Sequence, residues 1–308
     1  MQRYYKDSLS EFKEWKHLAH AKEWLIFPEN IGQYLSLDET ALSHGELYTV
    51  LTNKEAKGKK GSIVAIIAGT KAENIISLLN QHITQKQRKK VQEITLDMAG
   101  SMNLIARSCF PNASIVTDRF HVQQLATEAL QEIRIKHRWQ AIDDENESIE
   151  KAKLQKKKTW QPEVLSNGDT LKQLLARSRY VLYKKQKDWT GTQKQRAELL
   201  FERYPDLHQA YKLTQQLSTI FDTTKEKIFA TTKLARWHER VAQSGFKSFN
   251  TISRTIMNHY RTILNYFDNR STNASAESFN AKIKAFRAQF RGVTNIGFFL
   301  FRLTQIYA

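Results

Sequence analysis

Short apolar runs alternate with helically spaced apolar positions along the first 120 residues of this chain. The runs that predict strands are 34–38, 47–51, 63–67, 94–96 and 114–117. Turn-forming residues at 53–61 suit a hairpin loop between the second and third runs. Apolar residues at helical spacing predict helices over 1–22, 71–90 and 101–110.

The order of these elements predicts the fold. Three successive strands with short connections favour an antiparallel meander. The fourth strand is reached through a helix, so it must cross over and is expected to lie parallel to the first. The resulting order, β-β-β-α-β-α-β-α, is the ribonuclease-H-like arrangement. We therefore predict an α/β fold, a ribonuclease-H-like mixed five-stranded sheet flanked by helices.

Strand signals stop after residue 125, and a long polar region with helical spacing follows. We interpret residues 126–265 as a large all-helical insertion. Residues 31–125 and 266–308 would together form the ribonuclease-H-like domain, and residues 1–30 a separate N-terminal helical segment. The sheet-forming part of the chain is thus predicted to be split in sequence.

The chain is strongly basic, with 48 lysines and arginines against 31 acidic residues and a net charge of +17. This excess indicates a polyanionic partner, with nucleic acid ahead of an anionic membrane surface. The acidic run 143–150 and the basic run 151–158 are better explained as a solvated helical hairpin whose charges cancel. The later basic groups, with Trp160, Trp189 and Trp237 among them, are compatible with contacts to a DNA backbone.

Targeting and redox signals are few. No apolar run has the length of a membrane span, and the first residues lack the apolar core of a signal peptide. These features predict a cytoplasmic protein. The single cysteine, Cys109, excludes an intrachain disulfide framework and a cysteine-rich zinc site.

Aspartates stand at the ends of three predicted strands. Asp38, Asp97 and Asp118 each close an apolar run, and His121 lies three residues beyond Asp118. In open α/β sheets, ligands collect at the carboxyl ends of parallel strands. Because the first and fourth strands are neighbours in the predicted sheet, Asp38 and Asp97 should lie side by side. Glu277, which follows small polar residues typical of a helix start, could supply a third acid.

Clustered carboxylates repel one another unless cations bind between them. Oxygen ligands of this kind select Mg²⁺ or Mn²⁺ over zinc. Two such ions can activate a water or a sugar hydroxyl and stabilise the leaving oxygen in phosphodiester displacement. The pattern therefore predicts a metal site for phosphodiester chemistry.

Each acid also has a purely structural alternative. Asp38 could cap a turn before Thr40, and Asp97 could be the N-cap of the helix at 101–110. Glu277 could simply complement the dipole in a first helical turn.

The two remaining candidates also have competing interpretations. Asp118 competes with Asp97 for the same role. His121 could be a hydrogen-bonded core histidine, a residue that supports the ligands from behind, or a direct ligand.

The last predicted helix has two faces. Phe279, Ile283, Phe286 and Phe290 recur at helical spacing and form its apolar stripe, while cations share another face with Glu277. These cations could contact phosphates or be a solvated face. The candidate DNA-binding residues are Lys282, Lys284, Arg287 and Arg291.

Four segments carry a family resemblance: LSLDE around Asp38, ITLDMAG around Asp97, DRFHV at 118–122 and NASAESFNAKIKAFR at 273–287. Together they resemble the ISL-three family of bacterial insertion-sequence transposases. The resemblance implies a DDE triad of Asp38, Asp97 and Glu277 that holds two Mg²⁺ or Mn²⁺ ions. It implies hydrolysis of a phosphodiester at the ends of an insertion sequence and strand transfer by the freed 3′-hydroxyl. Asp118 and His121 would support the site.

Members of that family usually begin with a zinc ribbon and a helix-turn-helix, but this chain has one cysteine and few residues before Asp38. It resembles the catalytic half of the split ISAon-type transposases. The expected partners are therefore double-stranded DNA at element ends and target, further copies of the chain on that DNA, and a separate N-terminal DNA-binding protein. No membrane partner is expected, and the expected location is the bacterial cytoplasm.

Two other functions fit the same residues. A structure-specific nuclease on this fold would use the same acids without joining 3′ ends. An inactive transposase relative would bind DNA in a salt-dependent way and would not cleave it. A strand-transfer assay separates the three possibilities.

Overall fold

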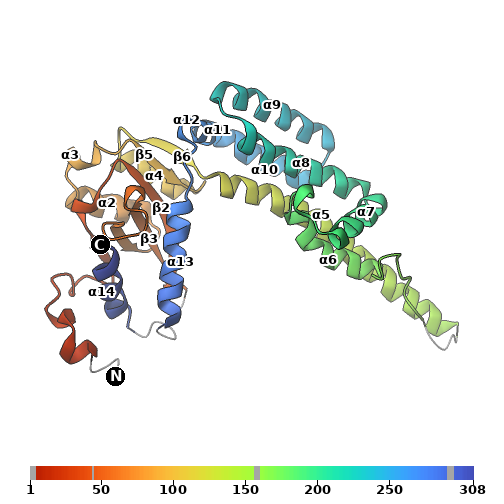
Figure 1. Cartoon of the computed structure of the whole chain (residues 1–308), viewed down its shortest axis with the longest axis horizontal. Helices are drawn as coiled ribbons and strands as arrows, with labels where there is room; N and C mark the ends of the chain where they lie inside the picture. Colours follow the sequence, from red (N-terminus) through yellow and green to blue (C-terminus); the bar gives the residue numbers. More distant parts are fainter. Residues whose placement is uncertain (1–4, 44, 156–159, 290–294) are drawn as a thin grey trace. The chain divides into compact units, whose positions relative to one another are not determined.

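A computed structural model of the chain describes residues 5–43, 45–155, 160–289 and 295–308 (Figure 1). The chain divides into two compact units. The first unit comprises Met1–His121 and Arg261–Ala308, and the second comprises Val122–Tyr260. The helical insertion predicted at 126–265 differs from the second unit by a few residues at each end.

The first unit contains a six-stranded mixed sheet. Its strands are β1 (Trp24–Ile26), β2 (Tyr34–Ser43), β3 (Glu46–Asn53), β4 (Ile63–Ala68), β5 (Glu93–Leu96) and β6 (Ser114–Thr117). The order across the sheet is β1-β4-β3-β2-β5-β6. β1, β4, β3 and β2 pair antiparallel, whereas β2, β5 and β6 pair parallel. The five predicted strands are confirmed, and so is the crossover that makes β5 parallel to β2.

The helix predicted over residues 1–22 is wrong. The described part of this segment has a π-helical turn at Tyr5–Leu9 and a 3-10 turn at Glu11–Glu14. The chain then forms β1, a strand that was not predicted from the sequence and that pairs antiparallel with β4. A three-residue strand is too short to show a period in the sequence, and pairing with β4 stabilises it. Phe12, one of the apolar positions of the expected helix, does pack on Phe298 and Phe301 near the C-terminus.

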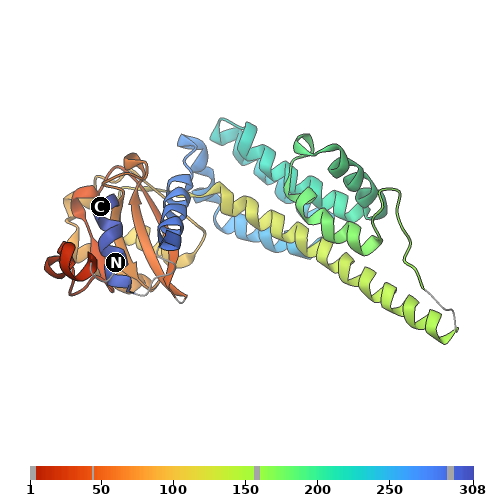
Figure 2. The same cartoon turned by 60° about the horizontal axis from the view of Figure 1, so that its bottom comes forward.

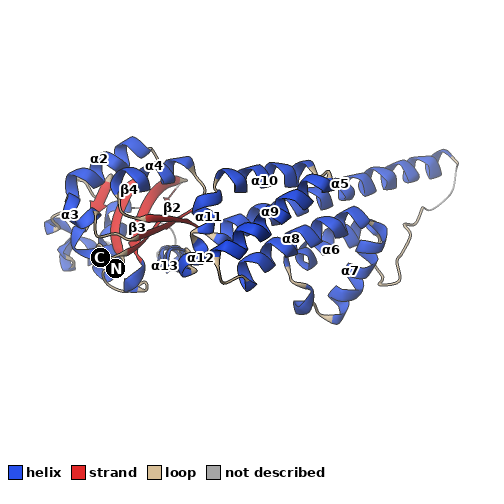
Figure 3. Cartoon of the chain, turned by 90° about the horizontal axis from the view of Figure 1, so that it is seen from above, coloured by secondary structure: helices blue, strands red, loops and turns tan. Residues whose placement is uncertain are grey.

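Helices cover both faces of the sheet. On one face lie α2 (Ala72–His82) and α4 (Gly100–Cys109), and on the other lie α13 (Ala274–Gln289) and α14 (Ile296–Tyr307). Figure 3 shows α2 and α4 on the opposite side of the strands from α13. Leu35 and Leu37 of β2 are buried in the core with α2 and α4, whereas Phe279 and Ile283 of α13 belong to the second core. Because side chains alternate along a strand, Asp38 faces α13.

The helix predicted over 71–90 is interrupted. The N-terminal part is α2, and the C-terminal part is the short α3 (Gln85–Arg88). Ile83 between them has an extended backbone. Thr84 then begins α3 with a capping box that includes Gln87.

Two short helices bring the chain back to the sheet after the second unit. They are α11 (Tyr260–Leu264) and α12 (Tyr266–Asn269). Asn265 donates from Nδ2 to the Ile115 carbonyl at 2.8 Å, and Asn269 donates from Nδ2 to Glu93 Oε2 at 3.2 Å. These bonds hold the segment before α13 against β5 and β6.

The second unit consists mainly of helices that run alongside one another (Figure 2). They are α5 (Arg119–Leu154), α6 (Leu171–Tyr183), α7 (Gly191–Arg203), α8 (Pro205–Thr223), α9 (Lys227–Ser244) and α10 (Lys247–Asn258). The acidic run and the first residues of the basic run lie on one helix, α5. There Lys151 pairs with Glu147 at 3.4 Å and Lys153 with Glu150 at 2.8 Å, so the two runs do pair their charges. The pairs form along one continuous helix and not across the predicted hairpin. Residues 156–159 of the basic run lie outside the described residues.

Candidate active site

Asp38 lies inside β2, opposite Val50 of β3. The strand continues to Ser43, so the alternative of a turn cap before Thr40 is wrong. Asp38 Oδ1 accepts a hydrogen bond from the Glu39 N–H at 2.8 Å. Burial raises the pKa of Asp38, and the carboxylates of Asp97 and Asp118 raise it further, against the lowering effects of the Glu39 N–H and of His121.

Asp97 follows β5 directly. The parallel pairing of Ser36 with Thr95 places Asp38 and Asp97 two residues further along, at the same edge of the sheet. Asp97 Oδ1 accepts from the N–H of Ala99 at 2.8 Å. The N-cap of α4 is Ala99 itself, so Asp97 is not the N-cap. The negative charge of Asp97 raises the pKa of both Asp38 and Glu39, as expected of near neighbours.

Asp118 follows β6 and is fully buried, with 0% of its surface exposed. Its Oδ1 accepts from the Phe120 N–H at 3.3 Å, in the first turn of α5. Its Oδ2 has no hydrogen-bond partner among the described residues. A buried carboxylate oxygen without a partner is costly unless a cation or water binds it.

His121 is half-buried in the first turn of α5. Its charge lowers the pKa of both Asp38 and Glu277, so it lies within electrostatic range of each. The alternative of a histidine enclosed in the core does not fit a half-buried ring that acts on two acids.

Glu277 lies in the first turn of α13 and is exposed. Its pKa is raised by partial desolvation and by the carboxylates of Asp118 and Asp38, and is lowered by His121. The structure therefore brings Glu277 from the far end of the sequence to the three groups from β2 and the β6–α5 junction. Glu277 also lies where an acid complements the helix dipole, so this stabilising role is compatible with a role as a metal ligand.

The acids differ in how well their placement and their chemistry suit a divalent cation. Within the described ranges, no three histidine, cysteine, aspartate or glutamate side chains are placed so that they could ligate one metal ion. The chemistry of the donors does fit: they are carboxylates that raise one another's pKa, and Asp118 has a buried oxygen without a partner. Hard oxygen donors with uncompensated negative charge suit Mg²⁺ or Mn²⁺, and side-chain rotation would have to complete the ligand set.

Asn280 was not among the residues predicted from the sequence. Its Nδ2 donates to Asp38 Oδ2 at 2.7 Å and so links α13 to β2. The two Asp38 oxygens thus each accept one hydrogen bond, which fixes the plane of the carboxylate. Asn280 lies one helical turn after Glu277, and this spacing was the available signal. Glu39 was also missed: burial raises its pKa, and so do Asp97 and Asp38.

The cations predicted on α13 have different surroundings. The Lys282 ammonium donates to the Gly58 carbonyl at 2.7 Å and lies 5.8 Å from the centre of the Tyr307 ring. Lys284 is exposed, and Arg287 is half-buried. The fourth predicted residue, Arg291, and Phe290 of the apolar stripe lie outside the described residues.

Lys282 is therefore engaged within the first unit. Gly58 has a positive φ of 70°, and a Cβ there would lie 2.6 Å from the Lys282 Nζ. Glycine is favoured at this position by the backbone conformation, whereas the tip of Lys282 could shift to admit a Cβ.

Comparison with known proteins shows the family of the chain. The model of the ISL3-type DDE family, which carries the description transposase, matches residues 35–303. The chain therefore belongs to this transposase family. No curated protein and no solved structure matches it. Among the described residues, no helix has both the length and the apolar character needed to cross a membrane.

Proposed function

We propose that this chain is the catalytic subunit of a DDE transposase, which cleaves a phosphodiester at an insertion-sequence end and joins the freed 3′-hydroxyl to target DNA. The family membership supports a transposase with DNA as its substrate. The observation that carries the finer proposal is the convergence of acids. Glu277 of α13 lies within electrostatic range of Asp38 and Asp118, and Asp38 in turn of Asp97.

In this proposal Asp38, Asp97 and Glu277 hold two Mg²⁺ or Mn²⁺ ions. Ions bound there would activate the attacking water or 3′-hydroxyl and stabilise the leaving oxygen. His121, when protonated, offsets part of the negative charge that the acids place together. Asp118 braces the start of α5 through its bond to Phe120.

DNA contacts and partners extend the proposal. Lys284 and Arg287 lie on the same face of α13 as Glu277 and would contact phosphates of the bound strand. Recognition of the element ends would come from a separate DNA-binding protein, and the active species would be an oligomer on DNA in the bacterial cytoplasm.

The direct test uses the purified chain, supercoiled plasmid and oligonucleotides with the terminal sequences of the source element. Nicking that requires Mg²⁺ or Mn²⁺, followed by joining of 3′ ends to a second DNA, is the expected result. Cleavage without joining would instead identify a structure-specific nuclease. Salt-dependent binding with no cleavage, even with the end-recognition protein present, would identify an inactive relative and refute the proposal.

Asn280→Ala is expected to slow strand cleavage about tenfold to a hundredfold. The variant loses one hydrogen bond to a charged acceptor, worth roughly 1.5–3 kcal/mol, and with it the fixed plane of the Asp38 carboxylate. The measurement is the single-turnover rate against Mg²⁺ concentration at saturating DNA. The Mg²⁺ concentration for half-maximal rate should rise while DNA affinity stays unchanged.

The matched control is Gln289→Ala, which removes an exposed amide from the same helix. It should leave both quantities unaltered. If Asn280→Ala weakened DNA binding and left the Mg²⁺ dependence untouched, Asn280 would contact DNA rather than position Asp38.

A further inference from the structure

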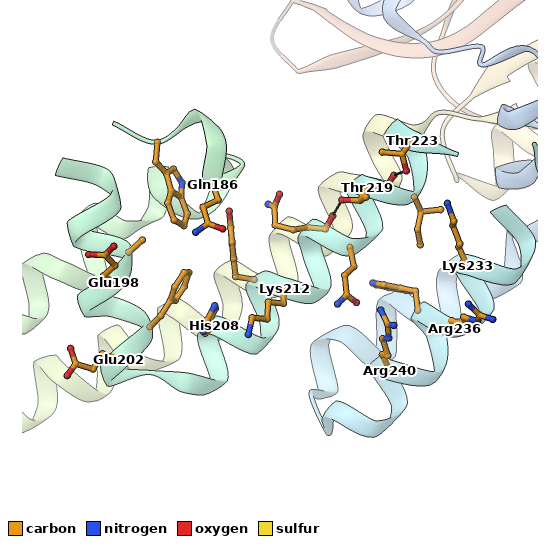
Figure 4. Close-up of a pocket in the computed structure, with 18 residues that line it drawn as sticks. Gln186, Glu198, Glu202, His208, Lys212, Thr219, Thr223, Lys233, Arg236 and Arg240 are labelled. Carbon is orange, nitrogen blue, oxygen red and sulfur yellow. Dashed lines mark hydrogen bonds between the residues drawn. The ribbon is translucent and has the colours of Figure 1, made fainter. Parts of the chain in front are cut away.

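The second unit contains an open pocket of about 850 Å³ between α7, α8 and α9 (Figure 4). Its two ends carry opposite charge. Figure 4 shows the glutamates of α7 at one end, the cations of α9 at the other and a lysine of α8 between them. These residues are Glu198 and Glu202, then Lys233, Arg236 and Arg240, and Lys212.

The cations of this pocket are exposed and largely uncompensated. Lys233, Arg236 and Arg240 follow one another at spacings of three and four, which places them on one face of α9. Among the residues that the structure describes, neither these cations nor Lys212 forms an ion pair with an acid. Lys233 donates to the hydroxyl of Thr224 at 3.0 Å, which leaves its charge in place.

The backbone beneath these cations is firmly held. Trp237, next to Arg236 in sequence, is 2% exposed and donates from Nε1 to the Leu213 carbonyl of α8 at 2.9 Å. This bond and the buried indole hold α9 on α8, so that the backbone positions from which Lys212 and the α9 cations project are fixed by helix packing. A ligand that bridges them meets a preformed arrangement of helices and orders only the side chains.

The aromatic part of the pocket is already satisfied internally. The rings of Phe201 and His208 stack with centroids 4.3 Å apart. Trp189 donates from Nε1 to the Val181 carbonyl at 2.9 Å. These rings pack on one another and on the backbone, and they form an apolar part of the pocket lining beside the exposed cations.

The exposed cations of the pocket favour a ligand that carries phosphate groups. Phosphate oxygens match exposed arginines and lysines, and arginine can hold a phosphate through two parallel hydrogen bonds. The glutamates of α7 repel phosphates and restrict them to the α8 and α9 side. Contacts of this kind fix the position of a nucleic acid without reading its bases.

We propose that Lys212, Arg236 and Arg240 bind the phosphate backbone of double-stranded DNA, independently of its sequence. The site lies wholly within the second unit. The inference rests on the proposed function for the identity of the polyanion as DNA, and it adds a DNA contact that the acids and α13 do not provide.

The first test measures affinity for a duplex of unrelated sequence in EDTA, over a range of salt concentrations. The pocket variant carries Lys212→Gln, Arg236→Gln and Arg240→Gln. We expect its affinity at low salt to fall about tenfold to a hundredfold and the slope of log affinity against log salt to shrink by roughly 2–3, close to one for each lost phosphate contact. Circular dichroism and a thermal melt check that the variant is folded.

The matched control removes the same number of charges where each cation already pairs with an acid. Lys151 pairs with Glu147, Lys153 with Glu150, and Arg203 with Glu163 at 2.8 Å. The variant with all three changed to glutamine should bind DNA nearly as the wild type does. Equal losses in the two variants would show a general charge effect and overturn the proposal.

A second test needs no variant. Acetylation of lysines in the wild-type protein, with and without duplex, should show protection of Lys212 and Lys233 and none of Lys151. Absence of that protection would overturn the proposal. Adenosine triphosphate or inorganic phosphate that protected Lys212 better than duplex, at equal phosphate concentration, would identify a site for a small anion and would also overturn it.

These outcomes are separable from those of the proposed function. Absence of strand transfer by the wild type, with DNA binding at the pocket intact, would refute the transposase activity alone. Normal strand transfer, together with wild-type DNA affinity of the pocket variant, would refute only the proposed DNA contact at the pocket.

Discussion

Asp38→Asn is expected to lower Mg²⁺-dependent strand cleavage by about a thousandfold. The loss of one charged ligand removes several kcal/mol of transition-state charge stabilisation, and about 4 kcal/mol corresponds to a thousandfold in rate. The asparagine keeps the shape of the side chain and an acceptor for the Glu39 N–H. The measurement is the single-turnover cleavage rate at saturating DNA.

The same substitution should make the metal-free protein more stable at pH 7.5. The pKa of Asp38 is raised in the folded state, mainly by burial. An acid of this kind contributes stability that is present below its unfolded pKa, about 4, and is lost as the pH rises through the folded value. At neutral pH its charge therefore opposes folding, and asparagine removes that cost.

Thermal melts in EDTA at pH 5 and pH 7.5 test this prediction. Asp38→Asn should melt higher than wild type at pH 7.5, and the difference should shrink at pH 5, where more of the wild-type Asp38 is protonated. The control is Asp143→Asn, at an exposed position on α5, which should follow the wild type at both pH values. A lower melting temperature for Asp38→Asn at pH 7.5 would contradict the assigned electrostatics.

Asp97→Asn should be as inactive as Asp38→Asn, whereas Asp118→Asn should retain more activity. Asp97 adjoins Asp38 at the sheet edge, where a shared cation would bind. Asp118 is fully buried, and an asparagine there can still accept from the Phe120 N–H. We expect losses of about a thousandfold for Asp97→Asn and roughly tenfold to a hundredfold for Asp118→Asn.

Single-turnover rates and Mn²⁺ binding by the two variants measure this difference. Asp118 is the alternative ligand, because among the carboxylates its charge raises the pKa of Glu277 most. If Asp97→Asn kept full activity and Asp118→Asn lost it, Asp118 would replace Asp97 as the second acid. The same exchange in Mn²⁺ affinity would confirm that reassignment.

The sheet could be predicted well from the sequence because its strands are apolar, short and separated by clear turn residues. β2 is longer than the predicted 34–38, since Glu39 and Thr40 lack the expected apolar alternation and are held by pairing with β3. The end of α2 at Ile83 was hidden because an apolar residue at helical spacing there adopts an extended backbone instead. In both places tertiary contacts outweigh the local secondary-structure propensity.

The strand-end acids could be predicted because the topology alone places Asp38 beside Asp97. The bond from Asn280 to Asp38 could not, since it joins residues 242 positions apart and depends on how α13 lies on the sheet. The lysines of α13 show the same limit: Lys282 and Lys284 look alike in sequence, but the loop carbonyl of Gly58 engages only the first.

The division of the first unit into two separated chain segments has a consequence for biosynthesis. Residues 1–121 leave the ribosome long before residues 261–308, with the whole second unit translated between them. During that interval the aspartates of β2 and β5 exist without Asn280 and Glu277. A nascent chain thus carries an incomplete set of acids, and under the proposed function it would be unable to cut DNA until α13 has been translated.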